Sequence, residues 1–427
     1  MAHHVLQERP ARWARLSRRL PAAAVLVLAW CAGAQAADWF VSPLGDDGTA
    51  GDQATPWRTI GRAVAAAQPG DTITVAAGEY REAIVIGNSG LPGEPITLQA
   101  APEARVVLNC PQPGGNLSGL DFRTVSHWVV EGFTLTGGYV NGAWIRFGAH
   151  HITLRRCRSE RNDRGVYGTE STDITLEDCE VADCQHGFES DACRRVSLTR
   201  CLAHGVKFVT GDNDPDGFSV ERQCSDVTLQ ECEAHHNEQA GFDIKAPGTV
   251  IRKCRAYENY HGFKAPYGWA LVEDSISLRN GDLGLMTEGG TSGPIRILRC
   301  TIAGNRQQGA KLTALPGRVN PPDPLIGWCV GRLPWPWENR PPAATYDVLI
   351  RDCIIAFNAS TALDFDAGVR LVCDHTVLYH EDEGFQIIVR RGNPEVRLSG
   401  KDVTAGALRS DVLPQFGPGI SVKRPAL

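Results

Sequence analysis

From about residue 125 the chain repeats a short pattern, and this repeat limits the possible folds more than any other feature. Each unit holds an alternating apolar segment, a cysteine, and usually an asparagine five residues later. The cysteine position is filled by Cys157, Cys179, Cys201, Cys232, Cys254, Ser275, Cys300 and Cys353, at steps of 22, 22, 31, 22, 21, 25 and 53 residues. The asparagine position holds Asn162, Asn237, Asn259, Asn280, Asn305 and Asn358, and in most units a glycine follows three or four residues later.

A period near 22 residues with two or three short strands per unit is typical of a parallel β-helix. Each unit is one coil of a solenoid, and equivalent residues of successive coils stack about 4.8 Å apart. The chain is rich in glycine, with 45 residues, and poor in methionine, with 2. This composition suits many short strands and turns. We therefore predict an all-β fold, a parallel β-helix of about 22-residue coils.

The 14 cysteines would normally suggest disulfides in an exported chain. Their spacing instead predicts a ladder of inward-facing thiols, because a small apolar residue packs well at that position. Cys193 and Cys224 each lie eight residues before a ladder cysteine. They are expected to be neighbours in register, which is compatible with a disulfide or with two thiols.

Residues 1–36 read as a secretory signal peptide. Five arginines precede an apolar run over residues 22–31, and Ala34-Gln35-Ala36 resembles a cleavage site. The apolar run is too short to span a membrane. We expect a secreted protein, extracellular or periplasmic, without a membrane span.

Residues 37–124 are expected to form an N-terminal cap and the first coils. An amphipathic helix is predicted over residues 57–67, followed by strands at 72–75, 83–86 and 96–99. Such a helix would cover the apolar edge of the first coil.

The β-helix proper is predicted over residues 125–391, with an irregular C-terminal cap or tail at 392–427. Two long steps mark inserted loops, near 205–216 and 312–344. The second holds eight prolines and three tryptophans, which could stack on sugar rings or tuck the loop onto the scaffold.

Charge limits the partners. The formal net charge is −6, and removing residues 1–36 makes it −10. No basic stripe suggests nucleic acid as a partner. An anionic polymer would be repelled overall and would need a local cation.

We expect the protein to be a monomer.

Strand alternation brings carboxylates and a lysine together. The pairs Gly217-Phe218, Gly241-Phe242 and Gly262-Phe263 recur at one position of successive coils. With the phenylalanines inward, the next residues point outward. The outward row is predicted to read Glu189, Ser219, Asp243, Lys264, Met286, Lys311 and Asp364. Lys264 would lie one coil, about 5 Å, from Asp243. The acidic loop before Phe218 carries Asp212, Asp214 and Asp216, which could converge on the same place.

An oxygen-rich cluster of this kind can bind Ca²⁺. The ion would neutralise a uronate carboxylate, acidify the adjacent C5 proton and favour neutral Lys264, which could then act as a general base. The chemistry that follows is β-elimination. Lys245, Glu189 and Arg222 are candidate substrate-binding residues. The alternative is that Lys264 only forms a surface ion pair with Asp243.

Two sets of motifs resemble a known family. The opening WFVSPLGDDG…TPWRTIGRAVAAAQPGDTITVAAGEY is similar to the N-terminal cap of many secreted polysaccharide lyases with a right-handed parallel β-helix. GDNDPDGF, then GFD, then GFK resembles family 9 pectate lyases. That resemblance implies a calcium site of four aspartates, with Asp216 and Asp243 among them, and Lys264 as the base. The family has two adjacent aspartates where this chain has Gln239 and Ala240; Asp212, Asp214 and Glu238 are the candidates to replace them.

The sequence thus predicts a secreted polysaccharide lyase for an acidic, uronate-containing polymer, with pectate the first choice and Ca²⁺ as cofactor. Two alternatives stay open. One is a lyase or C5-epimerase acting on alginate or another uronate, which begins with the same proton abstraction. The other is a non-catalytic β-helix that binds glycans.

Overall fold

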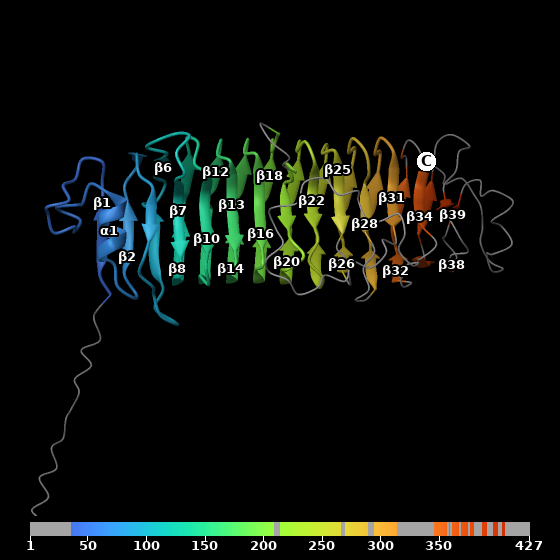
Figure 1. Ribbon diagram of the computed structural model, residues 1–427, viewed down its shortest axis with the longest axis horizontal. Coiled ribbons are helices and arrows are strands. Elements are labelled where there is room, and N and C mark those ends of the chain that lie inside the picture. The colour runs from blue at the N-terminus through green and yellow to red at the C-terminus, as the bar shows by residue number, and fades with distance from the viewer. Residues whose placement is uncertain are drawn as a thin grey trace, which may run out of the picture. The chain divides into compact units, whose positions relative to one another are not determined.

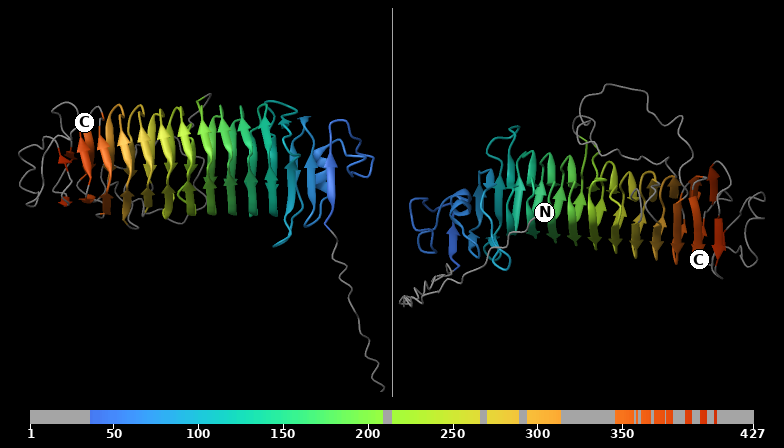
Figure 2. Two further views of the ribbon diagram at one scale, coloured as in Figure 1. Left: turned by 180° about the vertical axis from the view of Figure 1, so that it is seen from behind. Right: turned by 60° about the horizontal axis from the view of Figure 1, so that its bottom comes forward.

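The computed structural model describes residues 36–208, 214–265, 270–288, 294–313, 346–356, 358, 361–366, 369–374, 376–379, 387–390, 396–399 and 404–405. Residues 1–35 of the predicted signal peptide (1–36) and most of the inserted loop at 312–344 lie outside these residues. The unit from Ala36 to Leu427 is built from three parallel sheets whose strands follow one another coil by coil (Figures 1 and 2). This is a parallel β-helix, as the repeat predicts.

Sheet A has fourteen strands, which are β1 (Asp38–Val41), β2 (Thr72–Val75), β5 (Ile96–Ala100), β8 (Ser126–Glu131), β11 (His150–Arg155), β14 (Thr172–Glu177), β17 (Arg194–Thr199), β20 (Ser225–Gln230), β23 (Thr249–Arg252), β26 (Ala270–Glu273), β29 (Ile295–Leu298), β32 (Tyr346–Arg351), β35 (Val369–Asp374) and β38 (Val396–Ser399). Sheet B has thirteen shorter strands, which are β3 (Gly78–Tyr80), β6 (Val106–Asn109), β9 (Phe133–Thr136), β12 (Arg158–Glu160), β15 (Glu180–Ala182), β18 (Leu202–His204), β21 (Glu233–His235), β24 (Arg255–Tyr257), β27 (Ile276–Leu278), β30 (Thr301–Ala303), β33 (Ile354–Ala356), β36 (Val377–Tyr379) and β39 (Thr404–Ala405).

Sheet C, which carries the candidate site, has twelve strands. They are β4 (Ile84–Ile86), β7 (Ser118–Arg123), β10 (Asn141–Arg146), β13 (Arg164–Thr169), β16 (His186–Asp191), β19 (Phe218–Val220), β22 (Ala240–Ile244), β25 (His261–Ala265), β28 (Leu285–Glu288), β31 (Gln308–Thr313), β34 (Thr361–Asp366) and β37 (Ile387–Arg390).

One helix is present among the described residues, α1 (Ile60–Ala66), within the range predicted for the capping helix. The Thr59 side chain caps it by accepting a hydrogen bond from the Arg62 N–H. Its buried residues Ile60, Ala63 and Val64 join the core beside the first coils. Within the described residues no helix is long and apolar enough to cross a membrane.

Residues 392–427, predicted as an irregular C-terminal cap or tail, contain two short described strands. β38 pairs in register with β35, and β39 pairs with β36. Each of these strands gains backbone hydrogen bonds from the coil before it, so the ladder continues beyond the point where the sequence repeat weakens.

Cysteine and asparagine ladders hold the coils in register. The ladder cysteines are buried thiols that form no disulfide, and most of them donate to backbone carbonyls; Cys232 Sγ, for example, lies 3.4 Å from Leu198 O. Cys193 and Cys224 are neighbours as expected, but they form no disulfide. The amides of Asn237, Asn259, Asn280, Asn305 and Asn358 form a buried chain with Nδ2–Oδ1 distances between 2.9 and 3.3 Å.

Replacing one member of the asparagine ladder is expected to destabilise the fold. Asn259 accepts the backbone N–H of Asn237 at 3.1 Å and donates to Ala234 O at 3.0 Å. Asn259→Ala orphans these buried groups, at about 1–3 kcal/mol each. Urea unfolding measures the loss. Cys254→Ser is the matched control and should lose less, because Ser275 already fills the equivalent position with its hydroxyl bonded to a carbonyl at 2.8 Å. Equal losses in the two variants would contradict a special role for the amides.

Candidate functional site

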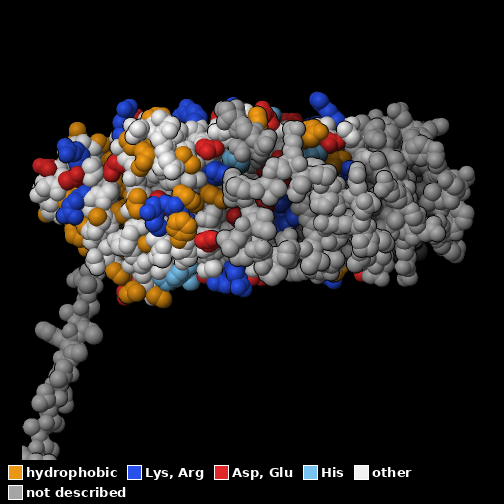
Figure 3. Space-filling model, viewed as in Figure 1, with side chains coloured by type: hydrophobic (Ala, Val, Ile, Leu, Met, Phe, Trp, Pro, Cys, Tyr) orange, Lys and Arg blue, Asp and Glu red, His pale blue; other side chains and the backbone are white. Residues whose placement is uncertain are grey.

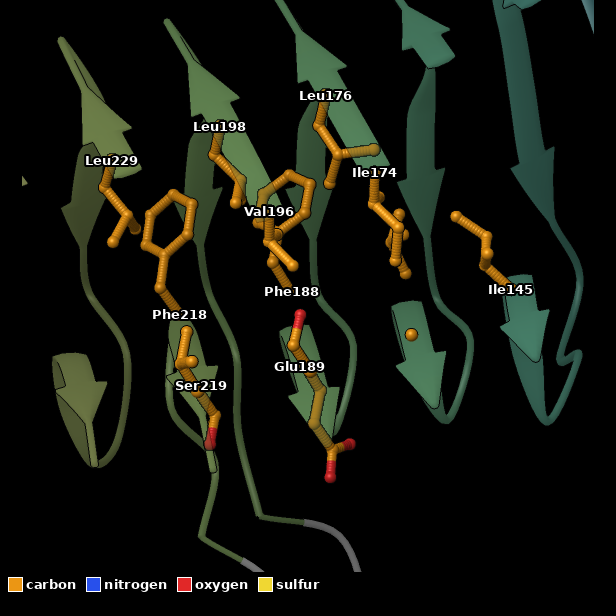
Figure 4. A pocket seen from close by; sticks show the side chains of 14 residues that line it. Ile145, Ile174, Leu176, Phe188, Glu189, Val196, Leu198, Phe218, Ser219 and Leu229 are labelled. Carbon is orange, nitrogen blue, oxygen red and sulfur yellow. The ribbon is translucent and has the colours of Figure 1, made fainter. Parts of the chain in front are cut away.

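The outward row on sheet C is formed as predicted. Glu189, Ser219, Asp243, Lys264, Met286, Lys311 and Asp364 are paired in register on successive strands. Each of the first four follows a buried phenylalanine, and the rings of Phe218 and Phe242 stack with centroids 4.7 Å apart. Figure 4 shows Phe188 and Phe218 directed toward Leu198 and Leu229 of sheet A. The Glu189 side chain extends away from this apolar cluster. The core therefore fixes which side chains of sheet C reach the surface.

Asp243 lies between two lysines. Its Oδ2 is 3.3 Å from Nζ of Lys264, which lies on the next strand. The same oxygen is 3.4 Å from Nζ of Lys245, the residue directly after β22. The side chain of Asp243 is 5% exposed and that of Lys264 is 18% exposed. Lys245 also forms an ion pair with Glu221 at 2.8 Å. Lys264 is thus largely buried but keeps some access to solvent.

Three carboxylates converge next to this pair. Asp214, Asp216 and Asp243 each offer an oxygen, and these oxygens lie within 4.8 Å of one another. Asp216 is 2% exposed, and one of its oxygens accepts the Ala240 N–H at 2.7 Å. Its Oδ2 is buried without a hydrogen-bond partner in the described part of the chain. Asp212, which was predicted to join the group, lies outside the described residues.

The carboxylates and the lysine set each other's protonation. Burial, together with the neighbouring Asp243, raises the pKa of Asp216 well above its usual value. Burial lowers the pKa of Lys264, but the carboxylates of Asp243, Asp216 and Asp214 outweigh burial and raise it. The pKa of Lys245 is raised in the same way: burial lowers it, and Asp243 and Glu221 raise it by more. Without a further cation, Lys264 is therefore held in its protonated form.

The cluster fits a hard divalent cation. Ca²⁺ takes six to eight oxygen ligands, usually carboxylates, carbonyls and water. Three carboxylates at this separation supply part of that set, and a buried oxygen lacking a described partner is the expected state of a ligand atom without its ion. At the two positions where the resemblance predicts aspartates, the Gln239 amide Nε2 lies 3.4 Å from Asp214 Oδ1 and the Ala240 side chain is fully buried.

Sequence reasoning missed His261 and Asp282. His261 Nδ1 lies 3.5 Å from Asp282 Oδ2, and both side chains are less than 15% exposed. Burial and then Lys264 lower the pKa of His261 to about 4, so the ring is neutral at pH 7. The signal was available in the register, since His261 pairs with Ala240, beside the acidic cluster, and lies three residues before Lys264.

A shallow, open hollow adjoins the cluster and is lined by Phe208, Pro215, Glu238, Gln239 and Tyr260. The side chains of Phe208 and Tyr260 are exposed by 51% and 47%. Exposed aromatic rings at the edge of a polar site can contact the apolar face of a sugar. The hollow therefore presents two exposed aromatic rings beside the acidic cluster.

The three predicted substrate-binding residues are placed differently. Lys245 contacts Asp243 directly, as described above. Glu189 lies two coils earlier in the outward row and accepts a hydrogen bond from Arg164 Nε at 2.7 Å. Arg222 is half-buried in the turn after β19, one residue beyond Glu221. Their contact with a substrate stays a prediction.

Comparisons with known proteins agree with this architecture. The family model described as "Pel9A-like, right handed beta helix region" matches residues 39–309. The chain belongs to this family. Its fold is a right-handed, pectate lyase-like β-helix. A curated relative, the uncharacterized protein YwoF of Bacillus subtilis (strain 168), is 31% identical over 85 residues. That match covers 20% of this chain and only 17% of the relative's length.

Solved structures with a similar fold include a pectate lyase, a mannuronan C-5 epimerase and an alginate epimerase. Pectate lyase Pel9A is 18% identical, with 88% of this chain and 82% of that chain covered and a TM-score of 0.46. The A-module of the Azotobacter vinelandii mannuronan C-5 epimerase AlgE6 is 16% identical, with 79% and 92% covered and a TM-score of 0.50. The periplasmic alginate epimerase AlgG is 13% identical, with 76% and 78% covered and a TM-score of 0.49. At these identities the likeness concerns the fold alone.

The buried charge of Asp216 predicts a pH effect on stability. A raised carboxyl pKa means that the folded state binds the proton more tightly than the unfolded state. The stabilisation that protonated Asp216 gives the fold is complete below the pKa of the unfolded state, near 3.8. It is lost as the pH rises through the pKa of Asp216 in the folded state. Asp216→Asn should therefore raise the unfolding free energy at pH 8 in EDTA and flatten its pH dependence, measured by urea unfolding. Asp214→Asn, at an exposed neighbour, should change the profile less. A larger effect of Asp214→Asn would contradict this account.

A carboxylate at position 239 should strengthen calcium binding. The Gln239 side chain already lies beside Asp214, so Gln239→Glu adds an anionic oxygen at the edge of the cluster. Ligand charge is one of the main determinants of Ca²⁺ affinity, and we expect roughly tenfold tighter binding. Isothermal titration calorimetry measures it. Glu221→Gln, which removes the carboxylate paired with Lys245, is the control. It tests whether any change of negative charge near the cluster alters the calcium affinity to the same extent.

Proposed function

We propose that this protein is a secreted lyase that cleaves a uronate-containing polysaccharide, pectate first, by β-elimination with Lys264 as the general base. The observation that carries the proposal is the in-register pair of Lys264 and Asp243 beside Asp216. Family membership supports a carbohydrate-active enzyme, since the family is described as Pel9A-like, Pel9A is a pectate lyase, and the mannuronan C-5 epimerase AlgE6 has a similar fold.

Lys264 is suited to remove the proton at C5 of a uronate. The lysine lies on a strand flanked on both sides by paired strands, so its backbone is rigid. In β-elimination the C5–H bond breaks and its proton passes to Lys264 Nζ. The C4=C5 double bond forms, the C4–O bond breaks, and the leaving oxygen takes up a proton. A neutral amine is required, so the carboxylates that raise the pKa of Lys264 must be neutralised first.

Asp214, Asp216 and Asp243 are the residues that would hold Ca²⁺. When bound, the ion would neutralise these carboxylates and that of the substrate, which lowers the pKa of Lys264 and acidifies the C5 proton. The side chains of this chain provide the rest. Lys245 offers a second cation for an anionic polymer, and its own pairing with Glu221 keeps its ammonium group in place.

Neutral His261 lies near Lys264 and can donate one ring N–H to a sugar hydroxyl or to the leaving oxygen. Tyr260, the preceding residue, contributes its exposed ring to the adjoining hollow. Together these groups would orient the polymer so that one C5 proton faces Lys264.

Removing the base tests the proposal. Lys264→Ala is expected to reduce elimination on polygalacturonate by about 10²–10⁴-fold, the usual contribution of a general base. The assay follows ultraviolet absorbance of the unsaturated uronate product. Lys311→Ala is the matched control, because Lys311 lies two coils further along the same outward row and should be dispensable.

The same assay separates the remaining possibilities. Product formation that EDTA abolishes and Ca²⁺ restores supports the metal-assisted lyase. Exchange of the C5 hydrogen in D₂O without an unsaturated product would identify an epimerase, with alginate and other uronates as further substrates. Binding of polymer without either reaction would identify a non-catalytic glycan-binding protein. Activity that persists in Lys264→Ala would exclude this lysine as the base.

A further inference from the structure

A second cluster of potential metal ligands lies on sheet A, away from the carboxylate site on sheet C. His127 is on β8, and His150 and His151 begin β11, the next strand of the sheet. One ring nitrogen from each of the three lies within 4.8 Å of the others. His151 is exposed and the other two are half-buried. In Figure 3, histidine side chains gather at the lower edge of the visible surface.

The solenoid itself brings these rings together. His150 pairs with Ser126, so His151 and His127 occupy the same position on neighbouring strands. Both have left-handed backbone conformations, with φ of 55° and 57°. Their rings stack with centroids 4.5 Å apart and an interplanar angle of 24°. His150 approaches from the preceding position, with its Nδ1 2.8 Å from Nδ1 of His151.

A fixed carboxylate stands beside the rings. Asp173 follows His151 at the equivalent position of β14, and its Oδ2 lies 3.8 Å from His151 Nδ1. Arg195 donates two hydrogen bonds to Asp173, at 2.6 and 2.7 Å. Metal-binding histidines commonly have such a carboxylate as an outer partner.

Another histidine pair in the same molecule shows what is particular to this cluster. His235 and His236 repeat the 2.8 Å contact between Nδ1 atoms. There, however, the third ring belongs to His204, which stacks on His235 and is bonded to Glu180 at 2.7 Å. His236 is paired with Glu258 at 2.9 Å. Among the described residues these three histidines do not converge, so the pair serves as an internal control.

We propose that His127, His150 and His151 bind a divalent first-row transition metal ion, with Zn²⁺ the principal candidate and Asp173 as the outer carboxylate. Imidazoles favour Zn²⁺, Cu²⁺ and Ni²⁺ over Ca²⁺ and Mg²⁺. Nitrogen ligands about 2.0–2.1 Å from one tetrahedral Zn²⁺ lie about 3.4 Å apart. The Nδ1 atoms of His150 and His151 lie 2.8 Å apart, and one nitrogen of each of the three rings lies within 4.8 Å of the others.

The ion would act as a clip between two coils. His127 and His150 are 23 positions apart in the sequence but lie on paired strands, so one ion would join neighbouring turns of the solenoid. Binding to the folded state alone raises thermal stability by mass action. This site is independent of the carboxylate cluster and of the proposed lyase reaction, because it uses other residues on another sheet.

The test uses the full chain with His3→Gln and His4→Gln in every variant, so that the N-terminal histidines contribute no binding. Metal-free protein is dialysed against Zn²⁺ with excess Ca²⁺, which saturates the carboxylate cluster, and bound zinc is measured by elemental analysis. We expect one bound Zn²⁺ per chain and a higher Tm. His127→Gln and His151→Gln should each weaken binding by about tenfold or more and remove the Tm rise. His236→Gln, from the control pair, should retain both.

Cu²⁺ provides an independent readout that does not depend on a variant folding. Its electron paramagnetic resonance spectrum in the unmodified cluster should show splitting from several imidazole nitrogens. Circular dichroism checks that the variants are folded. The proposal is overturned if Zn²⁺ stoichiometry is unchanged in both His127→Gln and His151→Gln, if His236→Gln weakens binding equally, or if the Cu²⁺ spectrum shows only oxygen ligands.

Discussion

Register between successive coils is the constraint on which this structure depends. Every strand of a coil pairs with the equivalent strand of the next, so an error of one residue would turn the inward face of a strand outward. The buried amide chain of the asparagine ladder opposes such a shift, because an amide such as that of Asn259 donates both to the neighbouring asparagine and to a backbone carbonyl. The stacked phenylalanines oppose it on sheet C. Chemistry at the surface is therefore aligned by contacts in the interior.

This alignment explains how a lysine and a cluster of aspartates can be held so close. Outward positions on neighbouring strands are fixed about 4.8 Å apart whether or not their charges attract. Asp243 and Lys264 attract each other, but Asp216 is buried next to Asp243 without a described partner for one oxygen. Such an arrangement costs stability unless a cation or a proton compensates it. The packing of the β-helix stabilises the arrangement of these groups, so the carboxylates can stay close together without full charge compensation.

Much of the architecture follows from the sequence because the repeat carries it. The positions of cysteine, asparagine and Gly-Phe determine the coil length. Strand alternation then predicts, from the sequence alone, that Asp243 lies beside Lys264. The positions of residues outside the repeat are harder to predict from the sequence. The convergence of Asp214 and Asp216 depends on the path of an inserted loop, and His261 reaches the site through register with Ala240, a pairing that the Gly-Phe pattern implies but does not highlight. β38 and β39 were missed because pairing with an ordered coil stabilises strands whose sequences no longer match the repeat.

The steps along the cysteine ladder have a consequence for how such a protein can change. Cys300 and Cys353 are separated by 53 residues, yet the Cys300 N–H lies 3.3 Å from Cys353 Sγ, as close as Cys193 N–H is to Cys224 Sγ across 31 residues. Residues that are 31 or 53 positions apart in the sequence can therefore occupy equivalent positions on neighbouring coils. The entropy cost of closing a loop grows only slowly with its length, so insertions of different length leave the pairing of the coils intact. New surface loops can be gained, lost or exchanged in evolution one coil at a time, while the alignment of the outward row on sheet C is inherited intact.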